Sequence, residues 1–147
     1  YLDMMKVAAI LKGKTIKNTV SLTISPGSKQ VYAMLAKNGA LADMIEAGAR
    51  ILECACGPCI GMGQSPNSKG VSLRTFNRNF EGRSGTKDAE IYLVSPETAA
   101  VSAINGFLTD PRKFEGEIPE IEIPKNFLIN DNLIDAPAQT SADVEVL

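Results

Sequence analysis

Short β-branched runs alternate with helical patterns over the first 110 residues, and this alternation constrains the fold more than any other feature. We expect strands at residues 19–25, 50–55, 71–76 and 89–94, each ended by Gly, Pro, Asn or polar residues. We expect helices at residues 2–12, 29–38, 41–47 and 96–107, where apolar residues recur at helical spacing. Strands that alternate with helices are typical of an α/β fold with a mainly parallel sheet.

Two serines mark the sharpest helix starts. Ser28 precedes an amphipathic run and can cap its first turn. Ser95 is followed by Pro96 at the first helical position and by Glu97 near the positive end of the helix dipole. The helix after Ser95 is predicted to bury the face made by Ala100, Ala103, Ile104 and Phe107.

The chain changes character after Lys113, where prolines recur and no long helical period remains. We therefore divide the chain into an α/β domain at residues 1–115 and an extended arm at 116–147. The first residue is Tyr1 and not Met, so we expect a piece of a longer protein whose α/β domain is incomplete at its beginning.

Composition excludes several classes of partner. The 147 residues are 44% hydrophobic and 22% charged, with a net charge of −2 and acids and bases mixed along the chain. This balance predicts neither a nucleic-acid partner nor a membrane surface. No apolar run is long enough to span a bilayer.

The three cysteines lie within six residues, in the stretch "ECACGPCIG" at 53–61, and the chain has no histidine. Such close packing is not typical of a disulfide scaffold and favours a reducing compartment, which we take to be the cytoplasm, or the mitochondrial matrix in a eukaryote. Without histidine, any metal site here depends on thiolates, carboxylates or residues from another segment.

Three interpretations of Cys56-Gly57-Pro58-Cys59 are open. A thiol–disulfide redox site has this spacing, but it requires a helix after the second cysteine, and Gly-rich loop residues follow Cys59. The cysteines can instead be apolar fillers at the end of a strand, where we expect Cys54 to be buried. The third interpretation is an iron–sulfur cluster with two thiolates from this turn and one from elsewhere.

The combination of motifs resembles the aconitase family of iron–sulfur hydro-lyases. The stretches that carry the resemblance are "ACGPCIG" at 55–61, "FNRNFEGR" at 76–83 and "SPETAAVSAINGFLTDP" at 95–111. The likeness runs from Tyr1 to about Pro111. It implies a three-layer α/β/α domain with an extended C-terminal arm.

The resemblance also implies roles for particular residues. Cys56 and Cys59 match two ligands of a [4Fe–4S] cluster, and the third cysteine ligand of the family lies in a Ser-Cys-Thr-Asn stretch just ahead of the position of Tyr1. Asn77 matches a residue beside the cluster. Arg78 and Arg83 match arginines that bind substrate carboxylates, which suits the bidentate guanidinium.

The activity implied is interconversion of citrate and isocitrate through cis-aconitate, as in aconitate hydratase and the tricarboxylic acid cycle. The family's catalytic base lies on another domain, so we expect no catalytic residue in this chain and no activity of the chain alone. An alternative is the large subunit of an isopropylmalate or homoaconitate dehydratase, which "EGRSGTKDAEIYLVSPETAAVSAINGFLTDP" also resembles. The long arm after Pro111 favours aconitate hydratase, because it suits a linker to a fused domain. The expected partners are a carboxylate substrate and the remaining domains of the same enzyme.

Overall fold

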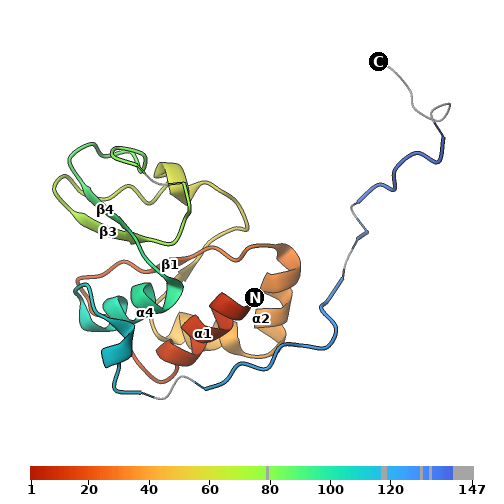
Figure 1. Cartoon of the computed structure of the whole chain (residues 1–147), viewed down its shortest axis with the longest axis horizontal. Coiled ribbons are helices and arrows are strands. Elements are labelled where there is room, and N and C mark those ends of the chain that lie inside the picture. Colours follow the sequence, from red (N-terminus) through yellow and green to blue (C-terminus); the bar gives the residue numbers. More distant parts are fainter. Residues whose placement is uncertain (79, 117–118, 130, 133, 141–147) are drawn as a thin grey trace.

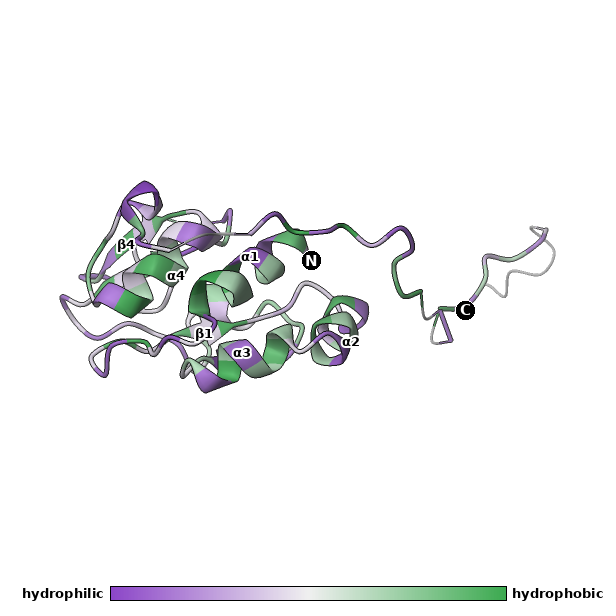
Figure 2. Ribbon diagram, turned by 90° about the horizontal axis from the view of Figure 1, so that it is seen from below, coloured by the Kyte–Doolittle hydropathy of each residue, from purple (hydrophilic) through white to green (hydrophobic). Residues whose placement is uncertain are grey.

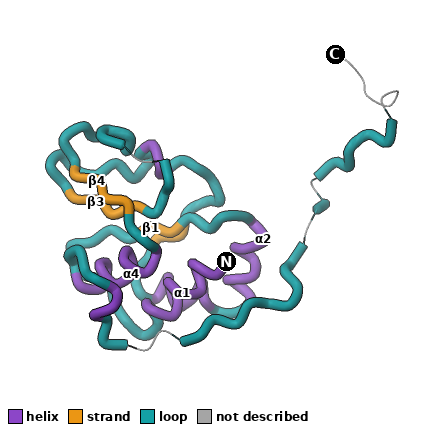
Figure 3. Tube along the Cα trace, viewed as in Figure 1, coloured by secondary structure: helices purple, strands orange, loops and turns teal. Residues whose placement is uncertain are grey.

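The structure is a computed structural model that describes residues 1–78, 80–116, 119–129, 131–132 and 134–140 (Figure 1). Its helices are α1 (Leu2–Leu11), α2 (Lys29–Lys37), α3 (Ala40–Glu46) and α4 (Pro96–Asn105). Its strands are β1 (Thr23–Ile24), β2 (Arg50–Ile51), β3 (Val71–Arg74) and β4 (Glu90–Leu93). Two short 3₁₀ turns, η1 (Pro58–Ile60) and η2 (Pro111–Lys113), complete the described elements (Figure 3). The predicted order of strands and helices is confirmed.

All strand pairing in the described residues is parallel, as predicted for an α/β fold. Strand β1 pairs with β2, and β3 pairs with β4, so the strands form two separate two-stranded sheets. The strands are shorter than the β-branched runs. The β1–β2 ladder ends near Leu52, whose backbone N–H donates to Ile24, because the chain then turns away into the cysteine stretch.

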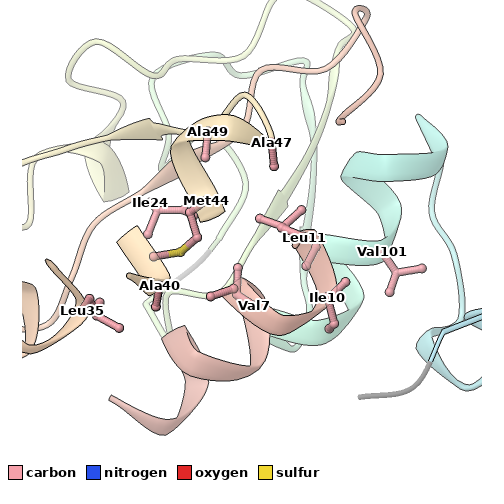
Figure 4. Close-up of a cluster of buried hydrophobic side chains, with 12 residues drawn as sticks. Val7, Ile10, Leu11, Ile24, Leu35, Ala40, Met44, Ala47, Ala49 and Val101 are labelled. Atoms are coloured by element: carbon pink, nitrogen blue, oxygen red, sulfur yellow. The ribbon is translucent and has the colours of Figure 1, made fainter. Parts of the chain in front are cut away.

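The hydrophobic core lies among the helices and the first sheet. Helix α1 packs against both α3 and α4 and buries Val7, Ala8, Ile10 and Leu11. The fully buried large apolar side chains are Ile10, Leu11, Leu35, Met44 and Val101 (Figure 4). Each contributes on the order of 1.5–3 kcal/mol by leaving water. The buried cluster takes no residue from β3 or β4, which lie beyond β1 in Figure 1.

Both predicted serine caps are confirmed. The Ser28 hydroxyl accepts a hydrogen bond from the Val31 backbone N–H at 3.2 Å, and Ser95 accepts one from Thr98 at 3.1 Å. Each cap satisfies an N–H group that the first turn of a helix leaves without a backbone partner.

The predicted burial of Phe107 is wrong, since its exposed fraction is 68%. Helix α4 ends at Asn105, and Gly106 takes a left-handed conformation with φ of +83°. The chain therefore leaves the helical path before Phe107. Val101 and Ser102 join Ala100 and Ala103 in the buried face instead.

The segment after η2 has no helix or strand in the part that the structure describes, as predicted for an extended arm. Tyr1 and Phe127 meet edge to face, with ring centroids 5.8 Å apart, and the chain then leads away from the helices (Figure 2). Within the predicted arm at 116–147, residues 117–118, 130, 133 and 141–147 lie outside the described residues. The division of the chain at residue 115 stays a prediction.

Candidate functional site

The cysteine turn begins where the chain leaves β2. A 3₁₀ turn over Pro58–Ile60 brings the Cys56 and Cys59 sulfurs to 2.7 Å, and the Cys59 thiol lies 2.9 Å from the Cys56 carbonyl oxygen. Cys59 is buried, with 4% of its surface exposed, whereas Cys56 is exposed. The turn therefore presents two thiols together, one of them open to solvent.

Cys54 is not the buried residue at the end of a strand that we expected. It lies in a bend beyond the end of β2 at Ile51 and is half-buried, so it is neither a strand residue nor fully buried. Within the described residues it makes no hydrogen bond to Cys56 or Cys59. The turn thus separates Cys54 from the thiol pair.

The surroundings of the thiol pair differ from those of a redox dithiol. The hydrogen bond with Cys56 and then the nearby Arg83 guanidinium lower the pKa of Cys59, although burial opposes this. The same hydrogen bond raises the pKa of the exposed Cys56. A redox dithiol needs its exposed first cysteine to be the acidic one, usually at a helix N-terminus. Here a 3₁₀ turn over Pro58–Ile60 and then loop residues follow the cysteines, and no α-helix lies between Cys59 and β3.

Close backbone packing holds the cysteine turn against the loop that carries Arg83. Gly61 adopts φ of +90°, and a side chain on it would overlap the Ser84 carbonyl oxygen and the Ser65 hydroxyl. Gly85 adopts φ of +98°, and a Cβ there would lie 2.6 Å from the same hydroxyl. Two glycines with left-handed backbones therefore allow the two loops to touch.

Arg83 is the predicted substrate-binding residue that the structure brings to the cysteines. Its guanidinium lies 5.7 Å from the centroid of the Phe80 ring and close enough to Cys59 to lower that thiol's pKa. The Arg83 Nε is buried and has no hydrogen-bond partner in the part of the chain that the structure describes. A buried N–H without a partner is costly, so this group is available to a ligand.

Within the described residues, no hydrogen bond or ion pair joins Asn77 or Arg78 to the cysteines. Both are exposed just past the end of β3, and neither side chain has a hydrogen bond or ion pair within the described residues. Asn79, which separates Arg78 from Phe80 in the motif, lies outside those residues. The roles of Asn77 and Arg78 therefore stay predictions.

Arg74 is a site residue that the sequence argument missed, because a charged residue within a strand gave it no role. Its guanidinium is buried and donates to the Pro58 carbonyl at 2.8 Å and the Gln64 carbonyl at 2.6 Å. These two carbonyls flank Cys59. The sequence shows only that Arg74 is a charged residue within a run predicted to be a strand.

The thiol pair suits iron–sulfur ligation in part. Thiolates are the ligands that hold such clusters, and the turn supplies two of them together. Within the described ranges, no group of three or more Cys, Asp or Glu side chains is arranged to hold a metal ion.

The described residues also include no helix long and apolar enough to cross a membrane.

Comparison with known proteins identifies the family. Residues 1–106 match the model of the Aconitase family, aconitate hydratase. The chain belongs to the aconitase family. The resemblance drawn from the cysteine and arginine motifs is thereby confirmed.

Similar proteins in the family are large subunits. The chain is 44% identical over 113 residues to 3-isopropylmalate dehydratase large subunit 2 of Archaeoglobus fulgidus, covering 76% of this chain and 27% of that protein. It is 44% identical over 116 residues to the homoaconitase large subunit of Thermus thermophilus, and the match covers 78% of this chain and 28% of that protein. It is 40% identical over 109 residues to the methanogen homoaconitase large subunit of Methanocaldococcus jannaschii, and the match covers 74% of this chain and 26% of that protein.

The chain thus spans about a quarter of the length of the curated relatives that it matches. Their names refer to 3-isopropylmalate and to homoaconitase. These names support the alternative, a large subunit of an isopropylmalate or homoaconitate dehydratase, better than the preferred interpretation as aconitate hydratase. The length of the arm was a poor guide, because an extended segment carries no information about the substrate of the domain before it.

Proposed function

We propose that this chain is the part of an aconitase-family hydro-lyase that supplies two cluster thiolates and a substrate-binding arginine. The proposed substrate is a hydroxy acid of the 3-isopropylmalate type, with the homoaconitase reaction second and citrate third. The named relatives support this order. The whole enzyme would work in a reducing compartment, which we expect to be the cytoplasm.

The contact between the cysteine turn and the Arg83 loop carries the proposal. In it, a guanidinium whose buried Nε has no hydrogen-bond partner among the described residues lies beside two thiols. A guanidinium pairs with a carboxylate through two parallel hydrogen bonds, which fixes both position and orientation. Arg83 would therefore hold a substrate carboxylate next to the place where the thiolates hold the cluster.

The proposed reaction removes a hydroxyl from one carbon and a proton from its neighbour, forming a C=C bond and water without net oxidation. When bound, a [4Fe–4S] cluster with an iron free of cysteine supplies Lewis-acid chemistry toward the hydroxyl. Cys56 and Cys59 would hold that group, and Arg83 would bind and orient one carboxylate. Arg78 would bind a second carboxylate, with Asn77 nearby. The base that takes the carbon-bound proton is proposed to lie outside this chain, so the chain alone should show no hydratase activity.

Hydration rates in the whole enzyme, together with its remaining domains or subunits, test the substrate order. We expect isopropylmaleate to be hydrated fastest, with homoaconitate and cis-aconitate slower. Fastest hydration of cis-aconitate would overturn the proposed order. Measurable hydration of any of the three by this chain alone would overturn the proposed division of labour.

The substitution Arg83→Lys tests the guanidinium, because it keeps the charge and removes the two-pronged donor. We expect kcat/KM to fall by about 10- to 100-fold, the loss typical of a charged hydrogen bond. Arg50→Lys is the matched control, because Arg50 is an exposed strand residue without a side-chain hydrogen bond in the described part of the chain. Equal kcat/KM in both variants would exclude Arg83 from substrate binding.

A further inference from the structure

Arg74 joins the second sheet to both ends of the cysteine-bearing segment at residues 58–64. Its Nη1 donates to the Pro58 carbonyl, its Nη2 to the Gln64 carbonyl, and its Nε to the Ser72 hydroxyl at 2.8 Å. The donors are fixed relative to one another by the planar guanidinium. Arg74 therefore clamps the segment that contains Cys59 and Gly61 at two points, while its bond to Ser72 holds the guanidinium on β3.

The clamp is anchored in regular structure. Arg74 is the last residue of β3, opposite Leu93 in the parallel ladder, and its carbonyl accepts from the Val94 N–H at 2.8 Å. The backbone hydrogen bonds within the segment close single turns, such as the one from the Gly61 N–H to the Pro58 carbonyl oxygen at 3.0 Å. The sheet thus supplies the rigid support, and Arg74 transfers it to the turn.

The charge of Arg74 has no carboxylate partner within the part of the chain that the structure describes. Only 9% of its surface is exposed, and its hydrogen-bond acceptors are two carbonyls and a hydroxyl. Burying a cation without a counter-charge is costly, and a neutral donor could make similar bonds at a lower cost. The Arg83 guanidinium approaches the same turn with a buried Nε that also lacks a partner among the described residues. Two cations at one turn indicate that negative charge gathers there.

We propose that Arg74 is a positioning residue: it clamps residues 58–64 so that Cys59 stays buried beside Cys56, and its charge offsets that of the bound thiolates. The clamp depends only on the contacts above. The charge role rests on the proposed function, because it takes the occupant to be an anionic thiolate-bound cluster.

The clamp is tested without any cluster, by measuring iodoacetamide labelling of each cysteine in the cluster-free whole protein by mass spectrometry. In Arg74→Gln and Arg74→Lys we expect Cys59 to be labelled at least about tenfold faster, with Cys54 unchanged. Lys should not restore protection, since one ammonium cannot bond both ends of the segment. Arg50→Gln is the matched control and should label like the parent protein.

A milder variant tests the clamp without removing the buried guanidinium, whose loss could unfold the protein. Ser72→Ala removes one of the three bonds and keeps the guanidinium, so it should expose Cys59 by a smaller factor in the same direction. Unchanged labelling of Cys59 in Ser72→Ala and both Arg74 variants would overturn the clamp. So would equal acceleration at Cys54 and Cys59, because that result reports global unfolding.

The charge role has a spectroscopic readout. In the whole protein reconstituted with iron and sulfide under anaerobic conditions, Arg74→Gln should bind less iron and alter the electron paramagnetic resonance spectrum, and Arg74→Lys should restore part of each. Parent-like iron content and spectra in Arg74→Gln would overturn the charge role while leaving the clamp. Absence of a cluster in the parent protein would overturn the proposed function and the charge role, and the labelling result would still decide the clamp.

Discussion

Substitution of Gly61 by alanine tests the contact between the two loops directly. The new methyl group would overlap the Ser84 carbonyl oxygen and the Ser65 hydroxyl. The backbone at Gly61 also has φ of +90°, which alanine adopts only at a cost. Gly63, two residues further along the same turn, has φ of +67°, but a methyl group there would have nothing within 4 Å. The pair of variants therefore separates the cost of the loop contact from the cost of the backbone conformation.

The magnitudes follow from these two terms. A left-handed alanine costs about 1–2 kcal/mol, which is the whole effect expected for Gly63→Ala. Gly61→Ala adds about 1–3 kcal/mol for forcing the loops apart, giving about 2–5 kcal/mol in total. For a chain of this size, each kcal/mol lowers the midpoint of thermal unfolding by about 2–4 °C or slightly more.

The assay is urea unfolding of the parent and both variants, followed by circular dichroism. We expect the free energy of unfolding to fall further for Gly61→Ala than for Gly63→Ala. We also expect Cys59 to be labelled faster only in Gly61→Ala, since that variant alone separates the loops. Equal losses of stability in the two variants, with Cys59 equally protected, would refute the argument from loop packing.

Three further predictions concern the core, a helix cap and pH. Met44→Ala should lower the free energy of unfolding in urea by about 2–5 kcal/mol, because the Met44 side chain is fully buried. Ile45→Ala should change stability little, because 52% of the Ile45 surface is exposed. Similar losses of stability in the two variants would contradict the packing described. Ser95→Ala should cost about 1 kcal/mol by removing the cap of α4, measured the same way, and no loss would contradict the cap. The hydrogen bond from Lys6 lowers the pKa of Glu97 below its usual 4.5, so this pair's contribution is complete above that value and is lost as pH falls through the lower folded pKa. Urea midpoints measured from pH 6 to pH 3 should therefore fall less steeply in Lys6→Met than in the parent, and parallel curves would contradict the linkage.

Local signals predicted most of the fold. Caps and apolar periodicity act over a few residues, so the starts of α2 and α4 and the position of α1 followed from the sequence. Strand lengths did not follow, because a β-branched run shows that a segment is extended and not how far a neighbour pairs with it. Phe107 was misplaced because Gly106 ends the helix before the apolar pattern does.

In the candidate site too, contacts within one turn could be predicted from the sequence, and contacts between distant segments could not. The spacing of Cys56 and Cys59 sets up a contact within one turn, and the structure contains it. The contacts of Arg74 reach carbonyls 10 and 16 residues away, and such side-chain-to-backbone bonds have no periodic signature in a sequence. The approach of Arg83 to Cys59 likewise depends on packing between two loops. The motif resemblance predicted a role for Arg83 but not this contact.

The central claim is that Cys56 and Cys59 hold the cluster and that Cys54 does not. It is tested most directly by iron and sulfide content, with electron paramagnetic resonance, of the whole protein after anaerobic reconstitution of Cys54→Ser, Cys56→Ser and Cys59→Ser. We predict parent-like content and spectra for Cys54→Ser and loss of most of the cluster in the other two variants. Retention of the cluster in Cys56→Ser and Cys59→Ser, or its loss in Cys54→Ser alone, would contradict the claim.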